Sequence, residues 1–137
     1  MQFLDTVSIT HEHVNGFSGR RSVTTAELKI ENPLEWRANH GEPVNWGVAR
    51  FARGSIRSNR HADARAIDEA QLEIISIALR GLRLGFAPLA SPGLYCDGGT
   101  DSLKIECGDW CLQVSWGSSP PENFIGIKQL RQALAGS

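Results

Sequence analysis

Alternation between apolar and polar residues predicts a strand near the start of the chain. Over residues 3–14, Val7 and Ile9 fall on one face, and mainly polar side chains fall on the other. This period of two is typical of a strand with one buried face. Asn15-Gly16 then indicates a tight turn, and the β-branched residues of 22–30 predict a second strand. The two segments therefore predict an antiparallel hairpin with a prominent loop at residues 15–21.

A second hairpin is predicted late in the chain. Residues 103–107 and 110–116 flank Gly108-Asp109, a glycine-first pair that suits a type II′ turn. A two-residue turn fixes the register of the strands that it joins. The predicted pairs are Cys107 with Trp110, Ile105 with Leu112, and Leu103 with Val114. These apolar residues share one face with Trp116, while the other face is largely polar, so we expect the sheet to be covered on one side only.

Two segments have helical periodicity. In residues 67–82, apolar residues recur at steps of three or four. The inward positions predicted there are Ile67, Ala70, Ile74, Ile75, Ala78, Leu79 and Leu82. Asp68 and Glu69 suit the first turn, and Gly85 is a plausible stop. Residues 124–135 predict a C-terminal helix capped by Asn123, with Ile127, Leu130, Ala133 and Leu134 inward.

The stretch between the first hairpin and the first helix shows little periodicity. Prolines, asparagines and a glycine over 31–45 suit an irregular connection, and a short strand is expected at 46–51. The arginines of 50–65 alternate with small polar residues, which is typical of a mobile basic loop. The chain is thus expected to be one α+β domain over 1–137, with a flexible insertion around 31–65. Its antiparallel sheet would have about four strands, in two hairpins, covered on one face by the central and C-terminal helices.

Charge and composition exclude some classes of function. The 137 residues include 14 basic and 15 acidic side chains, so the formal net charge is −1. No global field then draws the molecule to nucleic acid or to an anionic membrane. A basic segment followed by a long apolar run is missing at the start, and no 18 apolar residues occur together. We expect a soluble, cytoplasmic protein.

Histidine and cysteine spacing gives no complete chemical site. His11 and His13 are two apart on a strand, so their imidazoles point the same way, but no third metal ligand follows at a diagnostic spacing. The cysteines Cys96, Cys107 and Cys111 are odd in number and lack a C-x-x-C pair. Cys96 beside a histidine could form a catalytic thiol pair only in a particular fold. We expect neither a metal nor a cofactor, and no enzymatic activity.

Other segments resemble ligand-binding motifs only in part. Residues 97–101 lack the Lys-Ser/Thr of a phosphate loop and the terminal Glu of a calcium loop, so a turn into the second hairpin is favoured. The arginines of 50–65 lack interleaved aromatic residues, and a solvated loop that could meet an acidic protein is favoured there.

The loop at residues 15–21 is the best candidate for a binding surface. It comprises Asn15, Gly16, Phe17, Ser18, Gly19, Arg20 and Arg21. The phenylalanine could anchor in the cleft of another protein, because the flanking glycines let the backbone approach closely. It could equally fold back onto its own core, and the sequence leaves both arrangements open.

Residues 14–21, with their Gly-Phe-Ser-Gly-Arg-Arg sequence, resemble the opening of the emfourin family, small bacterial cytoplasmic inhibitors of thermolysin-like metalloproteases. The later order of a polar-capped helix, a hairpin, a proline-containing loop and a closing helix is also similar. Asn15 stands where the family usually has its first glycine, and residues 33–65 look like an insertion. The resemblance implies a protein-binding inhibitor that offers the 15–21 loop to a protease.

Two other classes of function remain. An immunity protein would neutralise a bacterial toxin, using the basic segment with Arg53 and Arg57 against an acidic surface. A small metal- or thiol-dependent enzyme would use the histidines or Cys96. In the first two cases the partner is another protein.

Overall fold

The fold is seen in a computed structural model that describes residues 2–36, 50–59, 63–82, 99–107, 110–117 and 126–135. Its six strands form one antiparallel sheet in the order β4-β3-β2-β1-β5-β6. The strands are β1 (Gln2–Val14), β2 (Arg21–Trp36), β3 (Phe51–Ser58), β4 (Arg65–Ala66), β5 (Thr100–Cys107) and β6 (Trp110–Trp116). The helices are α1 (Glu69–Arg80) and α2 (Ile127–Ala135). The chain is α+β, as predicted.

Strand β1 lies in the middle of the sheet and pairs with both β2 and β5. Val7 and Ile9 are completely buried on one of its faces, while Ser8 and Thr10 on the other face are partly exposed. The alternation read from the sequence therefore places the core on the expected side of this strand.

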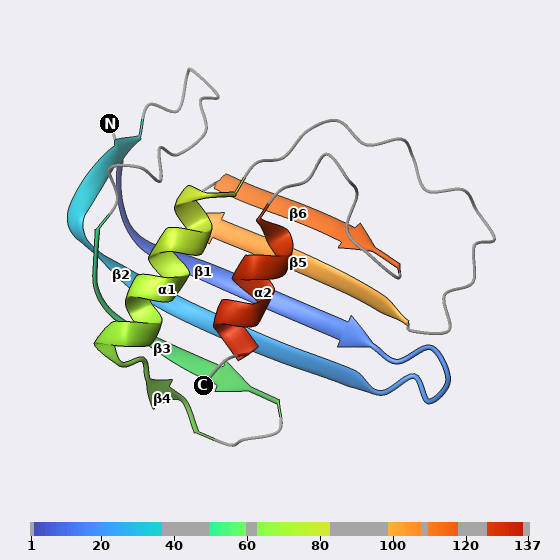
Figure 1. The fold of residues 1–137 in the computed structure, drawn as a ribbon. Coiled ribbons are helices and arrows are strands. Elements are labelled where there is room, and N and C mark those ends of the chain that lie inside the picture. Colours follow the sequence, from blue (N-terminus) through green and yellow to red (C-terminus); the bar gives the residue numbers. More distant parts are fainter. Residues whose placement is uncertain are drawn as a thin grey trace.

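Both helices lie against that same face of the sheet (Figure 1). They run antiparallel: near the start of α1, Gln71 Nε2 donates to the carbonyl of Ala133 at 3.2 Å, and at its end Gly81 lies against Gly126. Ile75, Leu79 and the four inward residues predicted for α2 are buried in one cluster with the strand residues. The core is thus a single layer between the sheet and two helices.

The second hairpin has the predicted register. Cys107 pairs with Trp110, Ile105 with Leu112, and Leu103 with Val114. Leu103, Ile105 and Cys107 are buried, whereas Cys111 on the opposite face is exposed. The turn residues Gly108 and Asp109 lie outside the described residues.

The sheet has more strands than expected, because the described parts of residues 31–65 form strands where a connection and a loop were predicted. Strand β2 continues to Trp36, and the basic segment that was expected to be a loop forms β3 and the short β4. The inward side of β3 consists of Phe51, Gly54 and Ile56, and a register shift next to Phe51 breaks their regular spacing. A Cβ at Gly54 would lie 2.8 Å from Leu28 Cδ2, so the position needs a glycine and the apolar alternation is lost there. Of the strand predicted at 46–51, residues 46–49 lie outside the described residues, and β3 begins at Phe51.

Helix α1 is correctly located, and most of the residues predicted to face inward are buried, namely Ile67, Ile75, Ala78 and Leu79. Asp68 caps its start by accepting from the Gln71 amide at 2.8 Å, and Gly81 follows its end. Ile74 was predicted inward but is 53% exposed, and Ala70 is also exposed. The polar residues Gln71 and Ser76 take buried positions because each bonds a backbone carbonyl. Gly85, the predicted stop, lies outside the described residues.

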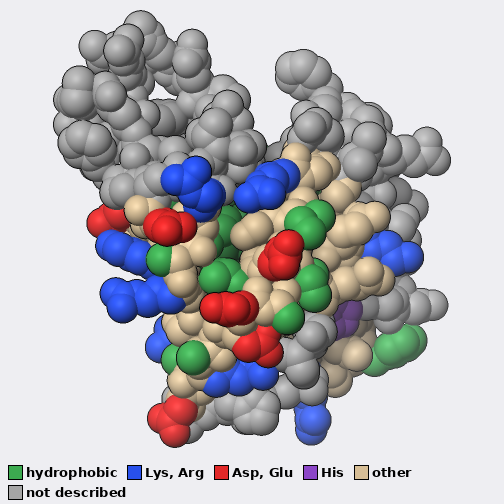
Figure 2. All heavy atoms as spheres, turned by 60° about the vertical axis from the view of Figure 1, so that its left-hand side comes forward, with side chains coloured by type: hydrophobic (Ala, Val, Ile, Leu, Met, Phe, Trp, Pro, Cys, Tyr) green, Lys and Arg blue, Asp and Glu red, His purple; other side chains and the backbone are tan. Residues whose placement is uncertain are grey.

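The outer surface is mixed in character. On the face seen in Figure 2, acidic and basic side chains intermingle with hydrophobic ones. Of the two helices that the structure describes, neither is long and apolar enough to cross a membrane.

The two described cysteines should differ strongly in reactivity. Burial, with a smaller effect of Asp5, raises the pKa of Cys107 to about 11. Because the thiolate is the reacting form, Cys107 should react with a maleimide at least about a hundredfold more slowly than Cys111 in the folded protein. Mass spectrometry of digested samples after timed labelling measures both rates. If Cys107 and Cys111 reacted at equal rates in the native protein, without denaturant, the assignment of faces would be contradicted.

Candidate functional site

The 15–21 loop joins β1 to β2 and is held by the side chain of its first residue. Asn15 Oδ1 accepts hydrogen bonds from the backbone amides of Phe17 at 2.9 Å and Ser18 at 3.0 Å. This arrangement is an Asx turn, in which a side chain takes the place of a backbone acceptor. Asn15 thus fixes the conformation of the loop.

Backbone hydrogen bonds close the loop at its base. The Asn15 amide donates to the Arg20 carbonyl at 2.8 Å, and the Gly19 amide donates to the Asn15 carbonyl at 3.0 Å. The predicted hairpin with a prominent loop is confirmed, since Val14 pairs with Arg21 and residues 16–18 form a turn directly after Asn15. Of the two glycines in the loop, only Gly19 has a positive φ, at 68°.

Phe17 lies at the exposed part of this loop. It is 83% exposed, which excludes the arrangement in which it folds back onto its own core. Arg21 forms an ion pair with Glu12 at 3.0 Å, whereas Arg20 is exposed and has no ion pair with the described residues. An apolar ring is therefore held away from the core by a loop with a defined backbone.

Gly99, the residue just before β5, lies against the base of the loop. Its φ is +86°, and a Cβ there would collide with the carbonyl of Val14 and crowd the amide of Gly16. The strand register places Val14, Arg21, Thr100 and Trp116 at this one end of the sheet. The chain that continues from Gly117 thus leaves the sheet at the same end as the 15–21 loop, and residues 118–123 lie outside the described part.

The structure does not bring Arg53 and Arg57 into the 15–21 loop. Both lie on β3 with exposed side chains, on the face opposite to the buried Ile56. Arg57 pairs with Thr25 and Arg53 with Lys29, so they lie along the uncovered face of the sheet. They belong to a different surface from Phe17.

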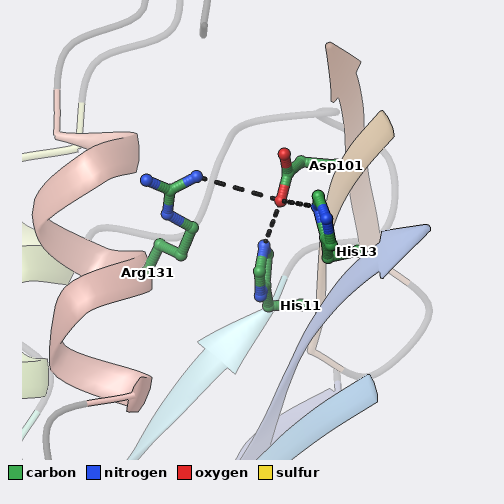
Figure 3. A network of polar contacts seen from close by, with 4 residues as sticks. All are labelled: His11, His13, Asp101 and Arg131. Carbon is green, nitrogen blue, oxygen red and sulfur yellow. Dashed lines mark hydrogen bonds and ion pairs between the residues drawn. The ribbon is translucent and has the colours of Figure 1, made fainter. Parts of the chain in front are cut away.

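A polar cluster occupies the core-facing side of the sheet near the same end. His11 and His13 continue the face of Val7 and Ile9, and the β1–β5 register places His13 opposite Asp101. Arg131 reaches the carboxylate from α2 (Figure 3). Strands far apart in the sequence and a helix therefore each contribute to one site.

One carboxylate oxygen holds this cluster together. Asp101 Oδ1 lies 2.9 Å from His11 Nε2, 3.2 Å from His13 Nδ1 and 3.8 Å from the guanidinium of Arg131. A carboxylate only accepts hydrogen bonds, so both of these ring nitrogens carry a proton. In the neutral rings, His11 Nδ1 and His13 Nε2 are then the unprotonated nitrogens. Asp101 itself is buried, at 7% exposure.

Burial lowers the pKa of His11 below its usual value, and Asp101 partly opposes this effect by its hydrogen bond and charge. Beside the cluster is an open depression of about 320 Å³, lined by His11, His13, Asp101, Arg131 and Gln132. The half-buried His13 and Arg131 are the most accessible of its charged or titratable groups. The site can therefore donate hydrogen bonds to a ligand through Arg131.

A metal ion does not suit the observed arrangement. Within the described ranges, no group of three His, Cys, Asp or Glu residues could hold one. Both imidazoles present protonated nitrogens to Asp101, and the nearby guanidinium repels a cation. His40, His61 and Cys96 lie outside the described residues, so the expected absence of metal and thiol chemistry stays a prediction.

The sequence reasoning missed Asp101 and Arg131. Asp101 has the parity of Leu103 and Ile105, so the alternation of β5 could have placed it on the inward face. Its meeting with His13 depends on the pairing of β1 with β5, which no local pattern reveals. Arg131 is adjacent to the buried Leu130 on the flank of α2, and its role follows only from how that helix is placed.

One further polar group at this end lacks a partner. Trp116 pairs with Asp101 across β5 and β6, and among the described residues its buried indole N–H has no acceptor. An unpaired buried donor has a free-energy cost of about 1–3 kcal/mol. The polar groups here are thus not all satisfied by the described residues.

Comparisons with protein-family models, with curated proteins and with solved structures found no match to this chain.

The lowered pKa of His11 predicts how stability changes with pH. The unfolded chain binds the His11 proton at higher pH than the folded one, so stability is lost as pH falls through the folded-state pKa. The melting temperature should decline between about pH 7 and about pH 5, above the range of ordinary carboxylates. His11→Gln should make this decline shallower, as differential scanning fluorimetry can measure. An identical slope in both proteins would show that His11 is not the responsible group.

Proposed function

We propose that this chain is a non-enzymatic protein-binding module that inhibits a partner enzyme with its 15–21 loop. The observation that carries the proposal is the 83% exposure of Phe17 on a loop whose backbone is fixed by hydrogen bonds. Exposing a large apolar ring has a cost in water, and that cost is recovered when the ring enters a cleft.

Preorganisation supports this use of the loop. A flexible loop loses conformational entropy on binding, and that loss reduces affinity. Here Asn15 accepts from two successive residues and also closes the base of the loop through its own amide and carbonyl. The backbone of Gly99 is in close contact with the base of the loop, which leaves no room for the loop to move toward the sheet. Little ordering is left to be done when a partner binds.

The partner we propose is a thermolysin-like metalloprotease. The support is the resemblance of residues 14–21 to the emfourin family, combined with the exposure of the phenylalanine in that motif. Arg20 flanks the ring and is available for a carboxylate at the rim of the cleft. Immunity against a toxin is the second candidate, supported by the exposed arginines that β3 aligns on the uncovered face of the sheet.

Phe17→Ala is the direct test. Losing an apolar anchor of this kind costs about 2 kcal/mol, so the inhibition constant against a thermolysin-like protease should rise roughly thirtyfold. The melting temperature should stay the same because the ring touches little of the core. Ile77→Ala is the matched control, since Ile77 is 58% exposed on α1 and should not affect inhibition.

Two results would count against the proposal. Wild-type protein without effect on such proteases would remove the protease from consideration. The immunity function would be favoured if the double variant Arg53→Glu and Arg57→Glu lost binding to a captured toxin while Phe17→Ala still bound it.

A second test separates loop order from ring burial. Asn15→Ala removes the acceptor for two backbone amides and should weaken inhibition several-fold while Phe17 is still present. Asn15→Asp keeps an oxygen at the same place and should retain most of the inhibition. Amide exchange measured by NMR at Phe17 and Ser18 should be faster only in the alanine variant. Full inhibition by Asn15→Ala would mean that loop order contributes nothing.

A further inference from the structure

We infer that the depression at His11, His13, Asp101 and Arg131 is a binding site for a small oxyanion, either a phosphate or a carboxylate. This site is separate from the proposed inhibitory contact of Phe17 and does not depend on it. It is formed by inward-facing residues of β1 and β5 and by the flank of α2 (Figure 3).

Arg131 supplies the main attraction for an anion. Its guanidinium has five N–H donors, yet among the described residues it makes only one loose ion pair, at 3.8 Å, and no hydrogen bond. Its side chain is 35% exposed, so a ligand can reach it from solvent. A planar guanidinium binds a carboxylate or phosphate through two parallel hydrogen bonds, which a lone amine cannot provide.

The carboxylate of Asp101 does not prevent anion binding. It is buried beneath the depression, and its Oδ1 already receives the imidazole protons of His11 and His13. Its charge is thus offset by Arg131 and by two N–H dipoles.

The size of the depression favours a small ligand over an extended one, and two further polar groups line it. His13 is half-buried with Nε2 engaged by none of the described residues, and the side chain of Gln132 lines the same space. The depression measures about 320 Å³, near the lower limit for ligand pockets. A cation is disfavoured by Arg131, and an apolar ligand would leave the Arg131 guanidinium and the Gln132 amide unpaired.

The experiment uses inorganic phosphate and acetate as probes, each compared with sodium chloride at equal ionic strength and neutral pH. Thermal shift and NMR titration of the imidazole signals are recorded for the wild-type chain. Arg131→Gln removes the guanidinium, and Lys128→Gln removes an equal charge from an exposed position of the same helix. Gln132→Ala provides a second site variant that retains every charge.

We expect a saturable rise in melting temperature with movement of the His11 and His13 signals. Arg131→Gln should weaken anion binding about tenfold or more, and Gln132→Ala by less, while Lys128→Gln leaves it unchanged. Response to phosphate alone identifies a phosphoryl ligand, and equal response to acetate identifies an acidic side chain or small acid. No saturable response beyond that of chloride, or equal weakening by Lys128→Gln and Arg131→Gln, would overturn the inference.

Discussion

The antiparallel pairing of β1 with β5 is the constraint on which the rest of the structure depends. It sets Ile9 opposite Ile105 in the middle of the core and His13 opposite Asp101 at the end. Since side chains alternate with a period of two, a shift of one residue would turn the histidines and the apolar residues to the other face together. The same register therefore determines both the core and the polar cluster. It also brings Gly99 beneath the 15–21 loop, so the loop and the cluster depend on one strand pair.

The two candidate surfaces differ in chemistry, since one exposes an apolar ring and the other presents partly buried charged groups. The 15–21 loop exposes an apolar ring on a backbone stiffened by Asn15, which favours a large partner with a cleft. The cluster around Asp101 keeps charge partly buried and leaves the Arg131 donors open to solvent, which favours a small polar ligand. Both lie toward the end of the sheet where β1 meets the loop, but neither needs the other in order to bind.

Local patterns predicted the parts of the fold that short-range rules control. The second hairpin follows from a two-residue turn and an unbroken alternation, and its register is confirmed from Cys107 to Leu103. Strand β3 escaped prediction because its inward side consists of Phe51, Gly54 and Ile56, and a register shift next to Phe51 breaks their regular spacing. In α1 only Ala70 and Ile74 differ from the predicted inward face, and the buried position beside Ala70 belongs to Gln71, which bonds Ala133 in a contact between helices distant in the sequence. The roles of Asp101 and Arg131 likewise depend on contacts between distant parts of the sequence. The sequence left both the exposed and the buried arrangement of Phe17 open.

Amide hydrogen exchange of the chain, free and in complex with a thermolysin-like protease, tests the central claim most directly. Peptides that cover residues 15–21 should become strongly protected in the complex, while the outer face of α1 and the strand β3 exchange as in the free chain. Unchanged exchange in the loop, with new protection on β3 or α1 instead, would contradict the account and place the binding surface elsewhere.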